Sequence, residues 1–503
     1  MDFLVLSPPV LTPSEPPSGA FMLAAGLKGQ GARAGLLDLS LAFFHTLFSD
    51  VSPPQQSALD YLRNSADGYE PMKHRSETGH LHCFVSGFEA RHPGWKLTLM
   101  DIAPPGRVHH PGQIDAALER GHSPFLKTFD THLQAALTRY KPEQVLISVA
   151  YLSQLPGAID LVRYLRERGV AFRVGGSLIN SLATTGHGFD IVQQVLGALS
   201  VGDGRELIPG GIDAPLLHRL AWPTMVLDAP YLSSHPVIPL SLSSGCYWNR
   251  CLFCPDREMP YSSIPMAALE QFLSSIPDEV MAKRPVLHLL DSAIPPGRLR
   301  QFLPMIESLP LGFFGFARPT RKLLDGGLLR AAADAGCLML QLGAEGGSRT
   351  LLDRYQKGID PAAAEAVVRG ASESGIRTYL YMLFGLPKET HEDLRMTSDF
   401  LCRNGEFIDF LNLSLFNLPR YCELMSRAEA FDIQVLDFPG EEGIRLYRPF
   451  LSRGVDQRRQ AREHLKKMRA VPEIREAILR TPRWFRAAHL ALMNIPGRYR
   501  VAP

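Results

Sequence analysis

Apolar runs of strand length alternate with amphipathic, helix-like segments through most of the chain, and this alternation predicts an α/β fold. It is most regular in the second half. Strands are predicted there at 237–242, 286–290, 312–316, 338–342, 376–383 and 408–414, and helices at 265–276, 297–308, 325–335, 361–374 and 390–403. Six β/α units predict a partial (β/α)6 barrel, in which catalytic groups lie at the carboxyl ends of the strands.

Residues 1–208 show the same alternation with one interruption. Strands are predicted at 3–6, before Asp38, at 145–149 and at 172–174, and helices at 19–30 and 156–168. Together these elements predict a doubly wound, Rossmann-like domain. An insert at 45–140 fits this pattern less well, because it holds two possible strands, the better one at 97–100, and is otherwise predicted to be loop.

The remaining segments divide the chain further. A Pro-rich stretch at 209–235 is predicted to be a linker, which leaves 236–425 for the barrel and 426–503 for a basic, mainly helical C-terminal region. Residues 450–503 contain thirteen Lys and Arg against four Asp and Glu, or about +9, so the rest of the chain carries about −7. A basic helix is predicted at 457–469, and a second helical stretch contains Trp484, Phe485 and His489.

Composition limits the possible classes of protein. Hydrophobic residues make up 45% of the chain and charged residues 21%, as in ordinary globular proteins, and the net charge of +2 does not favour nucleic acid. Met1 to Leu4 lack a basic leader region, and no apolar run approaches the roughly 18 residues of a membrane span. Seven cysteines, an odd number, fit a reducing compartment. A soluble, cytoplasmic protein is therefore expected.

Three of these cysteines carry the clearest chemical signal. Cys246, Cys251 and Cys254 lie within nine residues, with four and then two residues between them, directly after the first predicted barrel strand. Soft thiolates at this spacing favour an iron–sulfur cluster, and a set of three leaves one iron open to a ligand that is not protein. A structural zinc or a redox cluster is the alternative, although no fourth Cys or His stands nearby in the sequence.

The cysteine segment resembles the radical S-adenosylmethionine (SAM) enzymes, with Phe253 in the place of the family's aromatic residue before the last cysteine. The common motif has three residues in the first gap, and the longer gap here is similar to a subgroup with a cobalamin-binding domain in front. The resemblance implies a 4Fe-4S cluster whose open iron is chelated by the amino and carboxylate groups of SAM. One-electron reduction then releases a 5′-deoxyadenosyl radical.

The resemblance also implies a SAM site at the ends of later strands. Its expected members are Phe253, Asp291, Ser292, Glu345, Ser348, Gly385 and Pro387. Asp291-Ser292 departs from the family's turn, which has glutamate after the aspartate, whereas residues 343–348 match the family's Gly-x-Glu-x-Gly-Ser. Arg318, after the third strand, could bind a carboxylate, but an exposed arginine before a proline is the more ordinary expectation.

A cobalamin site is implied for the N-terminal domain. The residues that carry this resemblance follow predicted strand ends or begin the first helix: Ser7, Pro8, Ser18, Gly19, Asp38, Ser153, Gln154, Gly175, Gly176, Gly202 and Asp203. The chain lacks the Asp-x-His-x-x-Gly motif that supplies a histidine to cobalt, as does this subgroup. An α/β domain with tight glycine turns and no ligand is the alternative. His109-His110 is expected to be a solvated loop and not a metal site.

The resulting functional hypothesis is a cobalamin-dependent radical SAM enzyme that methylates an unactivated carbon and consumes SAM twice, as radical source and as methyl donor. A radical cyclase or rearrangement enzyme is the alternative enzyme, and a cluster-bearing redox or regulatory protein is the alternative of another class. A small-molecule or peptide substrate and a reductant such as flavodoxin or ferredoxin are the implied partners. A nucleic-acid contact through the basic C-terminal region is possible on charge alone, but a helical cap on the acidic barrel is favoured.

Overall fold

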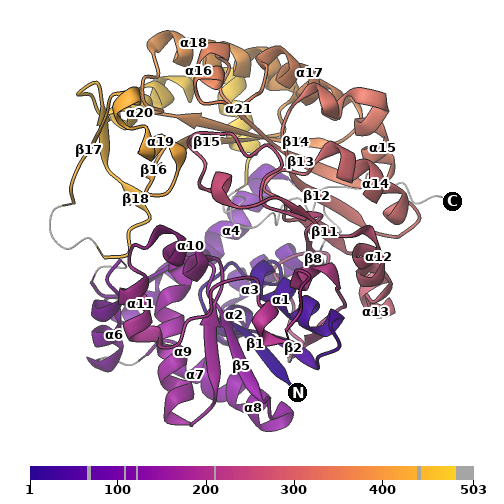
Figure 1. The fold of residues 1–503 in the computed structure, drawn as a ribbon, viewed down its shortest axis with the longest axis vertical. Coiled ribbons are helices and arrows are strands. Elements are labelled where there is room, and N and C mark those ends of the chain that lie inside the picture. The colour runs from indigo at the N-terminus through magenta and orange to yellow at the C-terminus, as the bar shows by residue number, and fades with distance from the viewer. Residues whose placement is uncertain (65–69, 107–108, 121–122, 209–210, 439–442, 483–503) are drawn as a thin grey trace.

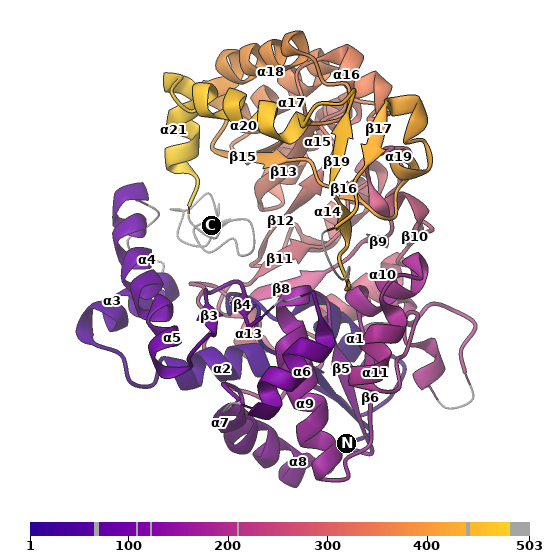
Figure 2. The same cartoon turned by 90° about the vertical axis from the view of Figure 1, so that its left-hand side faces the viewer.

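A computed structural model shows two parallel α/β units stacked on one another, with the C-terminal region beside the second (Figures 1 and 2). It describes residues 1–64, 70–106, 109–120, 123–208, 211–438 and 443–482. No helix among these residues combines the length and the apolar character needed to cross a bilayer.

The N-terminal unit is a five-stranded parallel sheet in the order β6-β5-β1-β2-β7. Its strands are β1 (Phe3–Ser7), β2 (Ala34–Asp38), β5 (Gln144–Ser148), β6 (Phe172–Gly175) and β7 (Thr224–Met225). The helices α1 (Ser18–Gly29), α9 (Leu155–Glu167), α10 (Ser177–Thr185) and α11 (Phe189–Leu196) complete the doubly wound pattern. Both faces of the sheet are covered, which is why every residue of β1 and β2 is buried. This confirms the predicted Rossmann-like unit.

The predicted linker is part of this unit. β7, within 209–235, pairs with β2 in parallel. Before it, a 3-10 turn at Leu216–His218 packs on α1, where a Cβ on Gly29 would lie 2.4 Å from the carbonyl oxygen of Arg219. The Pro-rich composition therefore indicates a segment whose described residues form no α-helix, and β7 joins this segment to the sheet by hydrogen bonds.

The insert at 45–140 is mainly helical, so the predicted loop is wrong. It contains α2 (Leu39–Leu47), α3 (Pro53–Arg63), α4 (Pro71–Ser86), α5 (Phe88–Arg91), α6 (Pro111–Arg120), α7 (Leu126–Thr128) and α8 (Gln134–Tyr140). Three of these helices begin at a proline, which interrupts no hydrogen bond in a first helical turn. The strand expected at 97–100 is reduced to β3 (Lys96–Leu97), which pairs with β4 (Ile102–Ala103).

His110 also departs from the expected solvated loop, because it is buried. The carbonyl oxygen of its neighbour His109 accepts a hydrogen bond from the backbone N–H of Ile444, 2.9 Å away. The loop thus joins the insert to the C-terminal region. No three His, Cys, Asp or Glu side chains among the described residues converge on a metal ion, here or elsewhere.

The second unit is a six-stranded parallel sheet in the order β15-β14-β13-β12-β11-β8, as predicted for a partial barrel. The strands are β8 (Val237–Leu240), β11 (Val286–Leu289), β12 (Gly312–Ala317), β13 (Cys337–Glu345), β14 (Arg377–Phe384) and β15 (Phe410–Leu415). The connecting helices are α12 (Met266–Ser274), α13 (Asp278–Met281), α14 (Pro296–Ile306), α15 (Leu328–Asp334), α16 (Arg349–Arg354), α17 (Pro361–Glu373) and α18 (His391–Asn404). Figure 1 shows α14, α15 and α17 along the outer side of the strands.

The C-terminal region begins with short strands, which the prediction of a mainly helical region missed. These are β16 (Leu418–Pro419), β17 (Ile433–Val435), β18 (Tyr447–Arg448) and β19 (Phe450–Ser452), with α19 (Glu423–Ser426) between the first two. The basic helix is confirmed as α20 (Gln457–Met468), and α21 (Pro472–Arg480) follows it. Trp484, Phe485 and His489 lie outside the described residues.

The two units share a hydrophobic core. One cluster of buried side chains runs from α1 of the N-terminal unit to β8 and α12 of the barrel. Trp222, from the segment predicted as a linker, lies between Phe21 and Phe272, with ring centroids 5.4 and 6.3 Å away. A Glu15 carboxylate oxygen lies 3.1 Å from His288 Nδ1 on β11. The loop after β1 therefore contacts the barrel directly.

Candidate functional site

The cysteine loop begins three residues beyond the end of β8, at the carboxyl edge of the barrel. Ser243–Ser244 (β9) pair in antiparallel fashion with Ser262–Ser263 (β10), which closes the loop at its base. Gly245 has φ +69°, and a Cβ there would lie 2.6 Å from the carbonyl oxygen of Pro260, so only glycine fits. Cys251 is buried, and Cys246 and Cys254 are half-buried.

Three bonds fix the loop to the rest of the barrel. The backbone N–H of Leu252 donates to the carbonyl oxygen of Tyr355 (3.1 Å), and its own carbonyl accepts from Leu424 (2.8 Å). Trp248 Nε1 donates to the carbonyl of Gln356 (2.8 Å). The Trp248 ring lies against Gly358, where a Cβ would come within 2.0 Å of it. The turn 355–358, between α16 and α17, therefore positions the cysteines.

Arg318 is buried beside the cysteine loop, and the expectation of an exposed arginine is wrong. Its Nη1 lies 3.9 Å from Cys251 Sγ, and its guanidinium stacks over the Trp248 ring at 4.3 Å. The second nitrogen donates to the backbone carbonyls of Lys357 and Gly358. A guanidinium offers five donors in a rigid fork, and here they link the end of β12 to the loop and to the α16–α17 turn.

Glu345 ends β13 and accepts a hydrogen bond from Lys357 Nζ at 2.9 Å. Lys357 is buried, and its ammonium lies 6.0 Å from the centroid of the Phe253 ring. The sequence analysis missed Lys357. Its signal was a Gln-Lys-Gly turn after a helix, in which Gln356 and Gly358 both have positive φ. A buried lysine in such a turn requires a partner, and Glu345 supplies it.

These groups make the cysteine loop fit an iron–sulfur cluster. Burial raises the pKa of the Cys251 thiol, while Lys357 and Arg318 act in the opposite direction. Burial raises the pKa of Cys254 to about 12. Buried thiols ionise when a metal binds them, and two neighbouring cations would offset the thiolate charge. Three thiolates can each bind a separate corner of a four-iron cluster.

Asp291 and Ser292 brace this loop through hydrogen bonds within the protein, and their SAM contacts stay predictions. The Asp291 carboxylate accepts from the backbone N–H of Leu242 (2.9 Å) and from the hydroxyl of Ser243 (2.5 Å). Burial raises its pKa to about 6. Ser292 Oγ donates to Asp256, which directly follows the last cysteine and Pro255. The turn after β11 thus holds both ends of the cysteine loop.

Three more predicted SAM residues have structural partners. Ser348 is buried, caps α16 by accepting from the N–H of Leu351, and donates to Asp393. Gly385 (φ +81°) donates its N–H to the Glu389 carboxylate at 2.6 Å. The carbonyl oxygen of Pro387 accepts from the Tyr355 hydroxyl. These hydrogen bonds shape the mouth of the barrel. Of the predicted SAM residues, Glu345 and Phe253 lie next to Lys357.

In the N-terminal unit, four of the predicted cobalamin residues come together at the ends of β1 and β5. Gln154 Nε2 donates to Ser7 Oγ and to the carbonyl of Pro8, both at 3.0 Å. Its Oε1 accepts from the N–H groups of Ala150 and Tyr151, and Gln154 is fully buried. These bonds use the hydrogen-bonding capacity of the amide, so Gln154 positions this edge, and its predicted contact with cobalamin stays a prediction. Ser153 precedes it in the same turn.

Asp38 is likewise a structural residue. Its carboxylate caps α2 by accepting from the N–H groups of Ser40 and Leu41, and the Tyr231 hydroxyl donates to it at 3.1 Å. Burial raises its pKa to about 6. The start of α2 and Tyr231 therefore already engage this carboxylate, and its predicted contact with cobalamin stays a prediction.

The glycines of this edge differ in what they permit. Gly176 has φ +111°, and a Cβ there would lie 2.5 Å from the carbonyl oxygen of Val149. The packing of the protein's own backbone therefore requires glycine at this position. Gly202 (φ +130°) is bonded through its N–H and C=O to Asn180 and has open space around its Cβ position. A Cβ on Gly19, at the start of α1, would lie 3.5 Å from Ser148 Oγ, which is an ordinary contact. Small residues here leave the backbone accessible to a flat ligand.

Of the other residues expected at this edge, Gly175 follows Val174 at the end of β6, Ser18 begins α1 and Asp203 pairs with Arg205 at 3.0 Å. Figure 1 places the N-terminus on the side of the sheet away from the barrel, so the carboxyl ends of these strands point toward the barrel. The loops that directly follow β1, β5 and β6, and the first turn of α2 after β2, contain no histidine.

No family model and no curated protein matches the chain. Among solved structures, the radical SAM methyltransferase TsrM from Kitasatospora setae, with cobalamin and a [4Fe-4S] cluster bound, is similar over 93% of this chain and 91% of its own, with TM-score 0.57 and 14% identity. Its structure with a tryptophan substrate and a SAM analogue gives TM-score 0.55 and 15% identity, over 93% and 89%.

OxsB, a cobalamin-dependent SAM radical enzyme with aqua-cobalamin bound, is similar over 91% of this chain and 65% of its own, with TM-score 0.54 and 14% identity. At such identities the likeness establishes the fold. The chain has the two-unit architecture of these proteins, a doubly wound domain followed by a partial barrel and a C-terminal region with helices, which confirms the predicted fold class.

Proposed function

We propose that this protein is a cobalamin-dependent radical SAM enzyme that transfers a methyl group to an unactivated carbon of its substrate. One observation carries the proposal. Three cysteines, with Arg318 and Lys357 beside them, follow the first strand of a barrel that is preceded by a doubly wound domain, in a fold shared along 93% of the chain with a cobalamin- and cluster-bound methyltransferase.

Cys246, Cys251 and Cys254 would hold the 4Fe-4S cluster and leave one iron for SAM. When bound, the cluster with SAM supplies a 5′-deoxyadenosyl radical, and cobalamin supplies the methyl group. Arg318 holds the buried Cys251 against the α16–α17 turn and places a fixed positive charge next to its sulfur. The hydrogen bond from Trp248 to the carbonyl oxygen of Gln356 holds the loop to the turn 355–358.

Glu345 is the residue of the predicted SAM set whose carboxylate remains close to the cysteine loop. Its hydrogen bond to Lys357 fixes the direction of one oxygen, and the second oxygen can accept from an ammonium group such as that of SAM. In the N-terminal unit, Ser7, Gly19, Gly175 and Gly202 would line the cobalamin site.

The products of SAM test the proposal. The reconstituted protein, incubated anaerobically with SAM, hydroxocobalamin and reduced flavodoxin, should form both 5′-deoxyadenosine and S-adenosylhomocysteine, detected by mass spectrometry. Both products should disappear in Cys254→Ala. Absence of both from the folded protein would contradict the proposal and would leave the redox or regulatory alternative.

The cyclase or rearrangement alternative is separated by the same assay. A radical enzyme that transfers no methyl group would form 5′-deoxyadenosine without S-adenosylhomocysteine. The substrate, the reductant and a cytoplasmic location remain predictions of the sequence.

A further inference from the structure

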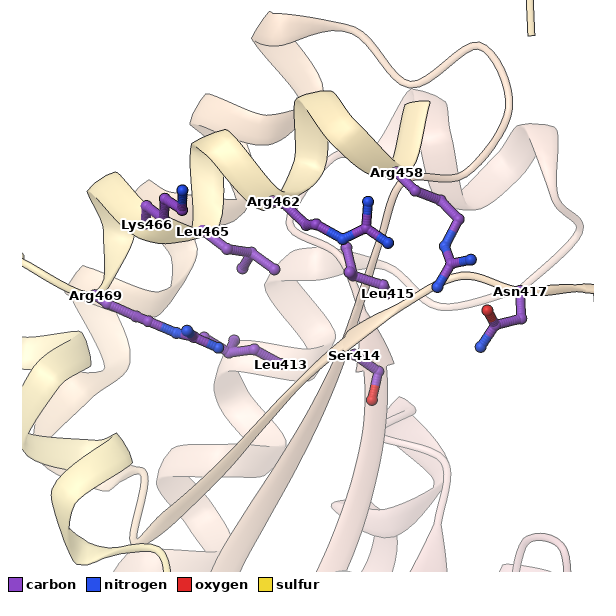
Figure 3. A pocket seen from close by; sticks show the side chains of 9 residues that line it. All are labelled: Leu413, Ser414, Leu415, Asn417, Arg458, Arg462, Leu465, Lys466 and Arg469. Atoms are coloured by element: carbon purple, nitrogen blue, oxygen red, sulfur yellow. The ribbon is translucent and has the colours of Figure 1, made fainter. Parts of the chain in front are cut away.

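A row of basic side chains on α20 lines a cavity at the edge of the barrel. The cavity has a volume of about 510 Å³ and is lined by Leu413, Ser414, Leu415, Asn417, Arg458, Arg462, Leu465, Lys466 and Arg469 (Figure 3). The four cations are spaced by four, four and three residues, so they share one side of the helix. Arg458 and Arg462 extend from α20 on the side of β15.

None of these four cations is paired with a residue that the structure describes. The neighbouring Arg459 on α20 is paired, since its Nε lies 3.4 Å from Glu463 Oε1. The Nε of Arg458 is buried without a hydrogen-bond partner. Like charges one helical turn apart destabilise a helix. The arrangement is therefore unfavourable by itself and would be relieved by an anion in the cavity.

The length of the row indicates what kind of anion fits. From Arg458 to Arg469 the helix rises about 16 Å, at about 1.5 Å per residue. A single phosphate or carboxylate would reach only part of such a row. About five residues of extended peptide cover the same length, since each residue spans roughly 3.3 Å. An elongated anion with several separate charges matches the row best.

The other lining residues favour a peptide over a nucleic acid. Leu413, Leu415 and Leu465 supply apolar surface, and Ser414 and Asn417 can hydrogen-bond. Among the residues that the structure describes, none that lines the cavity is aromatic, whereas proteins that bind single-stranded nucleic acid use aromatic rings to stack the bases. Arginine clusters beside apolar pockets are a usual means of recognising acidic peptide motifs.

The position of the cavity connects it to the proposed reaction. Leu413, Ser414 and Leu415 form the carboxyl end of β15, which is one edge strand of the six-stranded sheet, and the cysteine loop follows β8, which is the other. Both lie at the carboxyl end of the barrel strands, where substrates of such barrels bind.

We propose that the α20 cavity binds an acidic segment of a peptide substrate, while another part of the peptide enters the barrel. The role as a substrate anchor rests on the proposed function. The binding itself does not, because it needs neither cluster nor SAM.

Binding can be measured by fluorescence anisotropy with the full-length protein. The probe is a labelled peptide of about ten residues that alternates Glu and Leu, long enough to span the row of cations. It should bind at low salt and dissociate as ionic strength rises. The same peptide with Gln for Glu should bind at least about tenfold more weakly, because charge-assisted hydrogen bonds are lost.

A matched pair of variants locates the site. Arg458→Gln with Lys466→Gln removes two cavity charges, whereas Arg459→Gln with Lys467→Gln removes the same residue types one position along α20, outside the cavity lining. The first variant should lose affinity about tenfold or more. The second should change it less than about twofold, as exposed charges do, and circular dichroism should show both to be folded.

The proposal is wrong if the acidic peptide does not bind the folded wild-type protein, or if the two double variants lose affinity equally. It is also wrong if single-stranded RNA of equal charge displaces the peptide at lower concentration, since the cavity would then serve nucleic acid. Protein without iron suffices for every arm. Failure of the cluster proposal would therefore leave these results unchanged, and failure here would leave the products of SAM to be judged separately.

Discussion

At the scale of single residues, the account depends on a few buried charges around Cys251. Arg318 and Lys357 are both buried, and each has carbonyl or carboxylate oxygens as partners. Removing one member of such a group leaves the others uncompensated in a medium of low polarity. Conservative variants that keep the hydrogen bond and change only the charge are therefore the informative ones.

Glu345→Gln changes the charge in this way. The amide oxygen can still accept from Lys357, but the carboxylate for the SAM ammonium is gone. We expect the affinity for SAM to fall about tenfold or more, in line with the loss of one charge-assisted hydrogen bond. Iron content should not change. Isothermal titration of the reconstituted protein with SAM measures the affinity.

The matched control is Glu365→Gln, which removes a half-buried carboxylate of α17 that pairs with Arg403 of α18, away from the cysteine loop. It should bind SAM like the wild type. Equal affinities in Glu345→Gln and the wild type would remove Glu345 from the SAM site.

Glu389 predicts a dependence of stability on pH. Burial raises the pKa of its carboxyl group to about 8, from an ordinary 4.5. The folded state then holds the proton more tightly than the unfolded chain, so this stabilisation is complete below about pH 4.5 and is lost as pH rises through 8. Glu389→Gln abolishes the loss. Relative to the wild type, it should be more stable at pH 9 than at pH 5.5 by a few kcal/mol, at about 1.4 kcal/mol per pKa unit.

Urea unfolding at the two pH values measures this difference. Glu392→Gln is the control, because Glu392 is exposed and its pKa is lowered by hydrogen bonding to Arg395. That variant should gain no stability at high pH. Parallel stability profiles for Glu389→Gln and the wild type would show that Glu389 ionises freely in the folded state.

At the scale of elements, the α16–α17 turn holds the cysteine loop. Gly358→Ala would place a Cβ 2.0 Å from the Trp248 ring, in a backbone conformation with φ +63°. Gly169→Ala has the same φ, +63°, with no atom within 4 Å, so it reports the conformational cost alone. We expect Gly358→Ala to be less stable than Gly169→Ala by about 1–3 kcal/mol. It should also bind less iron after reconstitution.

Thermal unfolding and iron analysis of both variants provide the comparison. If Gly358→Ala loses no more stability than Gly169→Ala and binds iron fully, the contact between Trp248 and the turn does not position the cysteines.

The elements also show which inferences the sequence supports. Buried parallel strands are continuous apolar runs, so the six barrel strands were predicted within a few residues. The insert was predicted to be mostly loop, whereas three of its helices begin at a proline, at Pro53, Pro71 and Pro111. β7 and β16 to β19 are too short to leave a periodic pattern.

Site residues divide in a similar way. The cysteines and Glu345 follow strand ends and carry their own chemistry, so sequence can find them. Asp38, Gln154, Asp291 and Ser348 occur at the same edges and look the same in sequence, yet their side chains are occupied by the backbone and side chains of other segments. The position of Arg318 depends on contacts with residues distant in sequence: Cys251, 67 residues before it, and Gly358, 40 residues after it. The turn that contains Lys357 is fixed by the same contacts. A local pattern contains no such information.

At the scale of the whole molecule, the two units form a common core around α1. Phe21 of the first unit packs edge to face with Trp222 and with Phe272, which belongs to the second unit. Glu15 also bonds to His288 across the boundary. The carboxyl edge of the N-terminal sheet is thereby directed at the barrel (Figure 1). Two cofactor sites that must exchange a group require this placement of one strand edge toward the other.

The central claim is that each unit holds its own metal cofactor in the same molecule. Its most direct test is elemental analysis of protein that has been reconstituted anaerobically with iron, sulfide and hydroxocobalamin and passed through gel filtration. The account predicts about four irons and one cobalt per chain, with a base-off cobalamin spectrum because the sequence lacks the Asp-x-His-x-x-Gly motif that supplies a histidine ligand. Zinc in place of iron, or iron without cobalt in repeated preparations of folded protein, would contradict it.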